Sequence, residues 1–329
     1  MKKSLVLLSA LLAAPWSLAE VVTVYSARNE QLIKPVFDAY TKETGVQIRF
    51  VTGNEGALLE RLKAEGSASP ADLLMTVDAG NLWQASQQGV LKAVKSATLN
   101  AHIPPHLRDP GGEWYGLSVR ARTIFFNKAA VNPASLSSYE DLADPKWKGK
   151  LCLRTSKKVY NQSLVATLIA RLGEPKTEQI VRGWVANLAT DVFADDTAML
   201  KAIAAGQCAV GIANTYYYGR IVEKEPQFPV GIHWANQKTD GVHVNVAGAG
   251  LTRHAKNEQG AIKLLEWLSS EKAQNLFVDR NLEFPANPAI KPDPVVAAWG
   301  NFKPNLINVA KAGELQAQAT RLMDRAGYK

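Results

Sequence analysis

The chain has 329 residues, with 38 Lys and Arg against 30 Asp and Glu, and only two cysteines. This length is enough for about two domains. The net charge of +8 is spread along the chain without a run of five like charges, so a nucleic-acid-binding protein is not expected.

The first nineteen residues have the features of a secretory signal peptide. A basic start at Lys2 and Lys3 precedes an apolar core over 5–14 and the small-residue pattern 17–19. We predict cleavage after Ala19 and export of the mature chain. The apolar core is shorter than the roughly 18 residues that a membrane span needs, and no later run reaches that length.

The next part of the chain alternates between predicted strands and helices. Strands are expected over 21–25, 46–51 and 71–77, and helices over 30–43, over 57–64 and from 78 onward. This alternation predicts a mainly parallel sheet with helices on both faces.

Two loops of this sheet are candidates for ligand binding. Arg28 and Asn29 follow the first strand, and Asp78 follows the third, so both loops should lie at the same sheet edge. Helix N-termini at such an edge offer free backbone N–H groups to an anion. Asn29 is also a good helix N-cap, which is the simpler interpretation of this residue.

The segment 114–127 predicts a strand that crosses between two domains. Strand alternation places Arg120 and Arg122 on the same face. Two guanidinium groups on one face indicate either a solvated face or a clamp for an anion.

Tyrosines occur at two predicted strand-to-helix junctions in the second half of the chain. Tyr160 follows the strand 151–153, and Tyr216, Tyr217 and Tyr218 follow the apolar strand 209–213. A phenolate is a hard anionic oxygen ligand, which suits a small and highly charged cation. The alternative is that these rings are ordinary core or rim aromatics at strand ends.

The remaining segments give structural rather than chemical expectations. We expect a return strand and hinge over 244–250, one long amphipathic helix over 258–278, and a helical region over 305–326. Cys152 and Cys208 are equally well explained as a disulfide or as two buried thiols.

Motifs of known enzyme classes are absent from the sequence. It contains no phosphate-binding glycine loop, dinucleotide fingerprint or nucleophile elbow. Of its five histidines only His102 and His106 have a metal-ligand spacing, and the two prolines between them keep them off one helix face. An enzyme is therefore not predicted.

Taken together, these segments resemble the ferric-iron-binding periplasmic proteins, the solute receptors of bacterial iron ABC transporters, and among them a tyrosine-rich subgroup. The resemblance covers essentially the whole mature chain. The segments that carry it are Val24-Tyr25-Ser26-Ala27-Arg28, the run 69–80, Pro145-Lys146-Trp147-Lys148-Gly149, Val159-Tyr160-Asn161-Gln162-Ser163-Leu164 and Asn214-Thr215-Tyr216-Tyr217.

The resemblance implies an α/β fold of the two-domain periplasmic binding protein type. Each domain would be a mainly parallel sheet flanked by helices, with hinge strands between the domains and the ligand in the cleft. The implied N-terminal domain comprises 20–120 and 247–297, and the C-terminal domain comprises 121–246 and 298–329.

The same resemblance implies capture of Fe³⁺ through phenolates and delivery to an ABC permease in the inner membrane, by a monomeric, non-enzymatic protein. The implied metal ligands are Tyr160, Tyr216 and Tyr217. A synergistic anion such as carbonate would be held by arginine. The residues implied in anion binding or in support of the ligands are Arg28, Asn29, Arg120, Arg122 and Tyr218.

This chain departs from the family pattern after the first strand, where many members carry His or His-Tyr and this chain has Asn29 and Glu30. Two alternatives to iron therefore stay open. One is a receptor of the same fold for an organic cation or an oxyanion, with the tyrosines as a cage or as hydrogen-bond donors. The other is a secreted enzyme on this scaffold.

Overall fold

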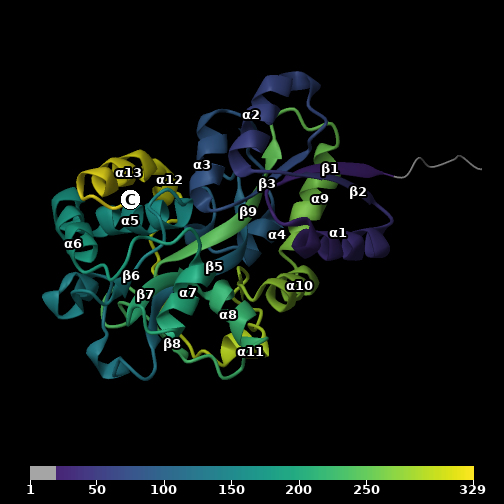
Figure 1. Ribbon diagram of the computed structural model, residues 1–329. Helices are drawn as coiled ribbons and strands as arrows, with labels where there is room; N and C mark the ends of the chain where they lie inside the picture. Colours follow the sequence, from purple (N-terminus) through teal and green to yellow (C-terminus); the bar gives the residue numbers. More distant parts are fainter. Residues whose placement is uncertain (1–19) are drawn as a thin grey trace, which may run out of the picture.

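The computed structural model describes residues 20–329, apart from the side chains of 278–280 (Figure 1). The predicted signal peptide and its cleavage site lie outside the described residues. Within them, no helix is both long and apolar enough to cross a membrane.

The N-terminal part of the chain forms the predicted parallel sheet. Strand β1 (Val21–Ser26) lies between β2 (Gln47–Thr52) and β3 (Leu73–Val77), parallel to both. Every residue of β3 is buried, which explains its continuous apolar run. The connecting helices are α1 (Glu30–Thr44), α2 (Glu55–Glu65) and α3 (Ala79–Gln87).

Helix α1 shows how local sequence sets these boundaries. The side chain of Asn29 accepts a hydrogen bond from the Gln31 backbone N–H, so the predicted N-cap is confirmed. Gly45 ends the helix with a φ of 77°, and its N–H bonds to the Thr41 carbonyl. A left-handed C-cap of this kind favours glycine because it has no Cβ.

Two long antiparallel strands cross the middle of the molecule. The first half of β5 (Tyr115–Asn127) pairs with β9 (Val244–Thr252), and its second half pairs with β7 (Val210–Asn214) and β8 (Val230–His233). Strand β9 also pairs with β3. The strand order is β2-β1-β3-β9-β5-β7-β6. Strands β9 and β5 therefore join the strands β1–β3 to the strands β6 and β7 (Figure 1).

The second region contains the parallel pair β6 (Leu151–Cys152) and β7, covered by helices. Helix α13, drawn in yellow, lies beside α5 at the far side from β1 (Figure 1). The helices of this region are α5 (Val159–Leu172), α6 (Glu174–Ala186), α7 (Asp196–Ala204), α8 (Thr215–Val222), α12 (Lys311–Glu314) and α13 (Gln316–Arg325).

The remaining elements are short or lie at the edges. They are β4 (Leu91–Lys92), β10 (Phe284–Pro285), α4 (Ala97–His102), α9 (Glu258–Leu268), α10 (Glu271–Asn281), α11 (Pro294–Ala297) and the 3₁₀ turns Gly66–Ala68, Pro105–Leu107, Pro133–Ser135, Glu140–Ala143 and Pro145–Trp147.

The apolar side chains form separate cores on the two sides of β5 and β9. The largest core packs around β1, β3 and α1, and two further cores pack around β6, β7 and their helices. The predicted two-lobed α/β class is therefore confirmed. The antiparallel pairings lie where β5 and β9 join the lobes, while the outer pairs β1–β2 and β6–β7 are parallel.

The prediction of one helix over 258–278 is wrong in one respect, because the structure has two helices in this segment. Helix α9 ends at Leu268 and α10 begins at Glu271. The Ser269 hydroxyl donates to the Glu266 carbonyl at 2.7 Å, and the Ser270 hydroxyl accepts from the Ala273 backbone N–H at 3.5 Å. Paired serines offer the backbone such local bonds and interrupt a helix whose apolar spacing otherwise continues.

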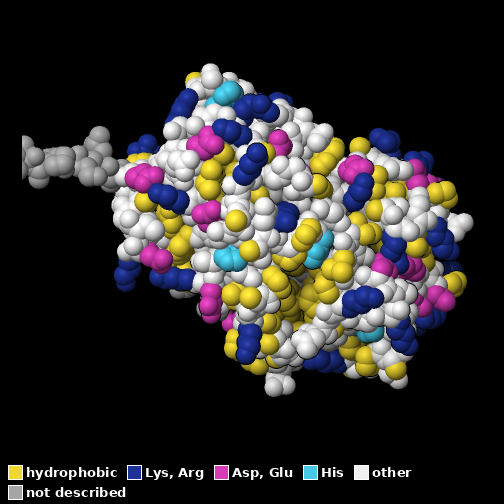
Figure 2. Space-filling model, turned by 180° about the vertical axis from the view of Figure 1, so that it is seen from behind, with side chains coloured by type: hydrophobic (Ala, Val, Ile, Leu, Met, Phe, Trp, Pro, Cys, Tyr) yellow, Lys and Arg dark blue, Asp and Glu magenta, His cyan; other side chains and the backbone are white. Residues whose placement is uncertain are grey.

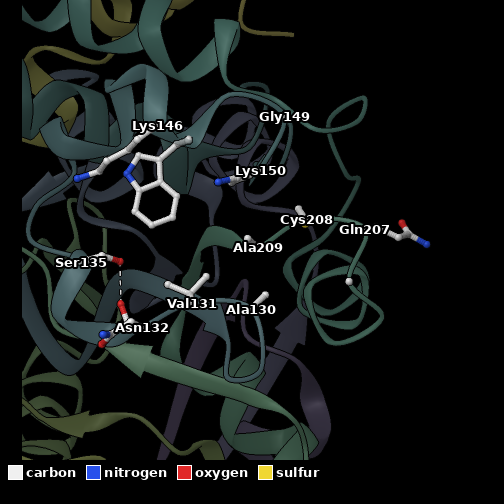
Figure 3. Close-up of a pocket in the computed structure, with 12 residues that line it drawn as sticks. Ala130, Val131, Asn132, Ser135, Lys146, Gly149, Lys150, Gln207, Cys208 and Ala209 are labelled. Carbon is white, nitrogen blue, oxygen red and sulfur yellow. Dashed lines mark hydrogen bonds between the residues drawn. The ribbon is translucent and has the colours of Figure 1, made fainter.

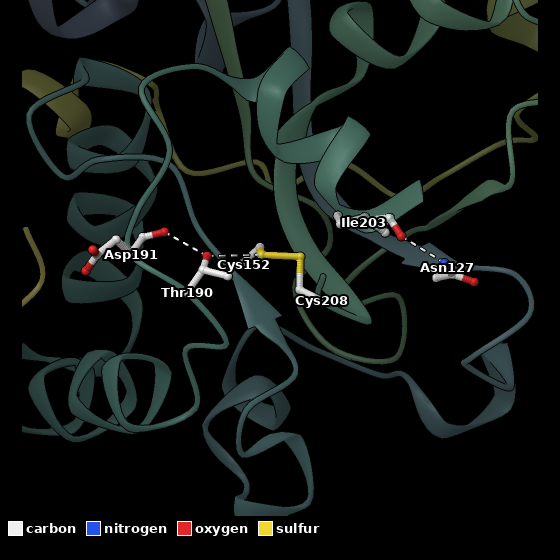
Figure 4. The surroundings of a disulfide bond; sticks show 6 residues. All are labelled: Asn127, Cys152, Thr190, Asp191, Ile203 and Cys208. Atoms are coloured by element: carbon white, nitrogen blue, oxygen red, sulfur yellow. Dashed lines mark hydrogen bonds between the residues drawn. A yellow bond between two sulfur atoms is a disulfide. The ribbon is translucent and has the colours of Figure 1, made fainter. Parts of the chain in front are cut away.

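Cys152 and Cys208 form a disulfide (Figure 4). It joins β6 to the turn before β7 across a sequence separation of 56 residues. The sequence had left a disulfide and two free thiols equally open, and the parallel pairing of β6 with β7 brings the two cysteines together.

Basic and acidic side chains are interspersed over the rear face of the molecule, and hydrophobic side chains gather near its centre (Figure 2). This distribution agrees with the dispersed charge of the sequence.

Candidate metal-binding site

Three tyrosines from two strand-to-helix junctions meet at one cavity. Tyr160 is the second residue of α5, and Tyr216 and Tyr217 are the second and third residues of α8. The cavity has a volume of about 170 Å³. Its other lining residues are Ala27, Arg28, Asn29, Leu32, Glu55, Val77, Arg120, Arg220 and Glu283.

The cavity lies between the two lobes because each lobe supplies part of its wall. The tyrosines come from the helices that follow the β6 and β7 region, whereas Arg28, Glu55 and Val77 lie at the ends of β1, β2 and β3. The carboxyl ends of parallel strands thus face the cavity, as is typical of binding sites in open α/β sheets.

The three phenols are in close contact. The rings of Tyr216 and Tyr217 lie 4.3 Å apart, and Tyr160 lines the same cavity. The sequence could place these residues at junctions but could not show that they meet. Their role as metal ligands remains a prediction.

The phenols of Tyr160 and Tyr216 are protonated at neutral pH. Burial raises the pKa of Tyr160 to about 12, against the opposing charge of Arg120. Burial also raises the pKa of Tyr216 well above its usual value, and the neighbouring Tyr160 and Tyr217 raise it further. A trivalent cation would reverse this preference, since it favours the ionised oxygen far more than one arginine does.

Cationic side chains surround the phenols. The Arg154 guanidinium lies 5.6 Å from the Tyr160 ring centre, and its Nη1 donates to the Tyr217 hydroxyl at 3.4 Å. Arg120 and Arg220 lie 5.6 Å and 5.0 Å from the Tyr216 ring centre. These charges favour phenolate formation, and Arg154 and Arg220 were not among the residues predicted from the sequence.

A buried carboxylate holds two of the predicted arginines in place. Glu283 accepts hydrogen bonds from Arg28 at 3.3 Å, from Arg120 Nε at 3.2 Å and from the Ser118 hydroxyl. Burial alone would raise the pKa of Glu283, but the charges of Arg120 and Arg28 outweigh it and hold the pKa at about 2. Glu283 is therefore ionised, and sequence reasoning missed it.

Arg122 supports the two tyrosine junctions rather than lining the cavity. It is fully buried and donates to Asp196 at 2.9 Å, to Asn161 at 2.7 Å and to Asn214 at 3.1 Å. Asn161 is next to Tyr160, and Asn214 ends β7 just before α8. The hydrogen bonds of Arg122 therefore hold the first turns of α5 and α8 in position.

The other two predicted residues differ in position. Asn29 lines the cavity while its side-chain oxygen caps α1. Tyr218 is not among the lining residues. Its hydroxyl donates to the Val230 carbonyl at 3.2 Å, and its ring packs against Phe125 with centres 5.2 Å apart. It belongs to the core beneath α7.

Comparison with known proteins now gives the family. Residues 36–304 match the family described as bacterial extracellular solute-binding protein. Iron uptake protein A1 of Synechocystis is 40% identical over 314 residues, which cover 94% of this chain and 87% of that protein. The chain belongs to the ferric-iron-binding periplasmic group of these proteins.

Solved structures of this group share the fold. The Trichodesmium protein IdiA (FutA), in complex with iron and citrate, matches with a TM-score of 0.91 and 43% identity over 94% of this chain and 100% of that one. Ferric iron-binding protein A of Mannheimia haemolytica, in an open conformation, matches with a TM-score of 0.88 and 35% identity over 94% and 99%. These relatives are named as iron-uptake or iron-binding proteins.

In this ferric-iron-binding protein, contacts between the lobes lie beside the cavity. The Ser163 hydroxyl on α5 bonds to Asp78 at 2.8 Å, and Lys158 lies 4.0 Å from Glu55. Asp78 precedes α3 with a φ of 75°, a strained conformation for a residue other than glycine. It also accepts from Asn245 at 2.9 Å, so β9 takes part in the same contact.

The residues that line the phenol cavity include no His, Cys or Met side chain. Within residues 20–329, no three His, Cys, Asp or Glu side chains cluster in a way that could hold a metal ion. A larger cavity of about 410 Å³ is lined by Cys208 of the disulfide and by none of the three tyrosines (Figure 3). Its wall includes Val131, Trp147 and Lys146, and Lys146 is paired with Asp141 at 2.7 Å. It presents no comparable set of ligands.

Proposed function

We propose that the protein is a periplasmic receptor that captures ferric iron between its lobes and delivers it to an ABC permease in the inner membrane. The ligands would be Tyr160, Tyr216 and Tyr217. The observation that carries the proposal is the convergence of these three phenols at one cavity between the lobes. Iron is the cargo of such a receptor, so no catalytic step is proposed.

The charges of the site support this assignment. Three phenolates offset the three positive charges of Fe³⁺ and are hard oxygen ligands suited to it. A small anion such as carbonate would complete the coordination from the side of Arg120. A receptor for an organic cation is less well supported, because Arg28, Arg120 and Arg220 in the wall would repel such a ligand.

The lobes proposed to close on iron are 20–120 with 247–297, and 121–246 with 298–329. The boundaries near 120 and 247 fall within β5 and β9, the long strands that connect the two sheets. We propose that these strands act as the hinge of a monomeric receptor, exported through a signal peptide cleaved after Ala19.

A visible absorption titration of the mature protein with a ferric salt tests the ligand set. We expect a phenolate-to-iron band that saturates at about one equivalent and is lost in Tyr216→Phe and in Tyr217→Phe. Tyr218→Phe is the matched control, because that ring lies in the same tripeptide but points into the core. A band that persists unchanged in both ligand variants would refute the proposed site.

A further inference from the structure

The segment 281–285 is a further place where the two lobes meet. Its strand β10 pairs with the first half of β5, and Glu283 pairs with Arg28 and Arg120. These contacts hold one side of the segment on the lobe that contains β1 and β3. Leu282, immediately before Glu283, instead contacts α8, the helix that carries two of the proposed ligands.

Gly219 provides the close approach that this contact needs. A Cβ atom at this position would lie 2.7 Å from Leu282 Cδ1 and 3.0 Å from the indole ring of Trp299. Glycine is among the least favourable residues in a helix interior, so its presence in α8 is explained by packing rather than by helix formation. Gly219 is three residues after Tyr216, so Leu282 fits into a notch on the side of α8 that carries Tyr216.

The backbone of Leu282 adopts an unfavourable conformation to make this contact. Its φ is 54°, in the left-handed region that bulky residues avoid, and only 2% of the residue is exposed. The side chain of Asn281 is fully buried, and neither of its amide atoms has a hydrogen-bond partner among the described residues. Neither feature stabilises the segment by itself, so the contacts on its two sides must impose this conformation.

The same contact lies against the ring of Tyr216. Tyr216, Leu282 and Val296 form one buried apolar cluster, on which Tyr217 also packs. Helix α8 has only eight residues, and the Asn214 side chain does not cap it, so tertiary contacts fix its first turn. Loss of the Leu282 side chain would leave a gap beside the Tyr216 ring and would free this turn to shift.

We propose that Leu282 is a positioning residue for the Tyr216 phenol, because it fixes the start of α8 relative to the opposite lobe through the notch at Gly219. This inference rests on the proposed iron-binding function. Glu283, the next residue, is bound to the opposite lobe, so the position of the Tyr216 oxygen is coupled to the closed arrangement of the lobes. Metal ligands that their surroundings hold in place bind more tightly than loosely held ones.

The test is a ferric titration of Leu282→Ala, followed through the phenolate-to-iron band, with competition against a chelator to give the affinity. We expect the affinity to fall by about tenfold or more, as is typical when a residue that orients a metal ligand is removed. We also expect the band maximum to shift, because the Tyr216 oxygen would meet the iron at a changed angle and distance.

Leu264→Ala is the matched control. Leu264 is also buried, but it lies on α9 in the core around β1 and does not line the cavity. This variant should lose folding stability through the same loss of buried side-chain volume, yet keep the wild-type band and affinity. It therefore separates general destabilisation from positioning of the phenol.

Gly219→Ala tests the notch from the other side and remains available if Leu282→Ala does not fold. Alanine favours a helix over glycine, so weaker iron binding in this variant cannot come from a weaker α8. The added methyl group should push α8 away from Leu282, lower the affinity and shift the band. In the double variant the two losses of affinity should not multiply, because the methyl group added at position 219 occupies space that truncation of Leu282 vacates.

Wild-type affinity and band position in Leu282→Ala or in Gly219→Ala would overturn the inference. An equal loss of affinity in Leu264→Ala would do the same, since the effect would then follow from stability alone. Failure of the proposed function is distinguishable, because the wild type would then give no ferric band.

In that case, fluorine NMR of the iron-free protein labelled with fluorotyrosine still decides whether Leu282 positions the ring. The Tyr216 signal is assigned by its loss in Tyr216→Phe. We expect this signal to shift in Leu282→Ala and to stay in place in Leu264→Ala. A Tyr216 signal that does not move in Leu282→Ala would refute the positioning role.

Discussion

Burial keeps two of the three proposed ligands protonated until a cation arrives. The pKa of Tyr160 is raised to about 12, and that of Tyr216 is raised well above its usual value, so neither offers a phenolate to a weakly charged ion. Only a strong Lewis acid displaces such protons at neutral pH. The site thus favours a trivalent cation through the cost of ionising its own ligands.

Glu283 should make the free energy of unfolding depend on pH in the acidic range. Its pKa is lowered from 4.5 to about 2 by Arg120 and Arg28, against the effect of burial. A lowered pKa means that the stabilisation is complete above the unfolded value and is lost as the pH falls from about 4.5 toward 2. We expect the free energy of unfolding to fall over this range in the wild type and to fall less steeply in Glu283→Gln.

Urea unfolding at a series of pH values, followed by circular dichroism, measures this difference. Glu60→Gln serves as the control, because it removes an exposed carboxylate on α2 that pairs with Lys63 at 2.9 Å. Parallel curves for the wild type and Glu283→Gln between pH 5 and 2.5 would show that the buried pair does not contribute in this way.

At the level of single residues, the sequence predicted what local patterns encode. Tyr160, Tyr216 and Tyr217 follow apolar strands, so their place at the sheet edge could be inferred, and Asn29 was identified as a cap. Glu283 could not be found, because its partner Arg28 is 255 residues away and its own segment has no periodicity. The sequence indicated only that Arg122 shares a strand face with Arg120. Its support of α5 and α8 depends on Asp196, Asn161 and Asn214, which are distant in the sequence.

At the level of elements, β5 and β9 explain how one chain forms two lobes. Strand β9 pairs with β3 and with the first half of β5, and the second half of β5 pairs with β7. The lobes are therefore joined by continuous strands rather than by a flexible linker. The contact between α5 and Asp78 then joins the lobes beside the cavity. A movement that separates α5 from the end of β3 would break this contact.

Replacing Ser163 by alanine should weaken the contact. Asp78 would keep its bonds from Gly80 and Asn245 but would lose the one from helix α5. We expect the free energy of unfolding to decrease by about 1–2 kcal/mol, and bound iron to dissociate faster. Chemical denaturation and stopped-flow transfer of iron to a chelator measure the two effects.

Ser135→Ala is the control for this substitution, because the Ser135 hydroxyl is exposed and bonds only within its own turn, to Asn132 at 2.7 Å (Figure 3). If Ser163→Ala releases iron at the wild-type rate, the contact between α5 and Asp78 has no part in holding the lobes together.

The disulfide should stabilise the second lobe. It closes a loop of 56 residues, for which the chain-entropy relation gives roughly 4 kcal/mol, within the usual range for disulfides of 2–5 kcal/mol. We expect the double variant Cys152→Ala, Cys208→Ala to lose stability of this order while keeping its phenolate band. Equal midpoints of denaturation for the oxidised wild type and the variant would contradict this expectation.

Sequence reasoning at this scale succeeded for most strands and failed where tertiary context decides. The alternation of β1, α1 and β2 is encoded in apolar spacing and caps. The apolar spacing continues across Ser269 and Ser270, so a single helix was predicted, yet the two serines end α9 and begin α10. The disulfide depends on the pairing of β6 with β7, which no local pattern reveals.

For the whole molecule, the division of labour between the lobes is the central feature. One lobe supplies the three phenols, and the other supplies the Arg28, Arg120 and Glu283 group. The three phenolates would offset the charge of Fe³⁺, and arginines from both lobes, Arg120 and Arg220 among them, would offset that of a bound anion. Iron and anion should therefore be bound fully only when both lobes face the same cavity.

Proton release on loading is the consequence that tests this arrangement as a whole. Tyr160 and Tyr216 are protonated at neutral pH because burial raises their pKa values, so binding of iron must displace at least these two protons. The logarithm of the apparent affinity should then rise by at least about 2 for each pH unit, and iron should be lost as the pH falls. Competition against a chelator of known pH dependence, between pH 5.5 and 7.5, measures the slope. Tyr218→Phe should keep the wild-type slope, whereas a wild-type slope below 1 would mean that buried phenols are not the ligands.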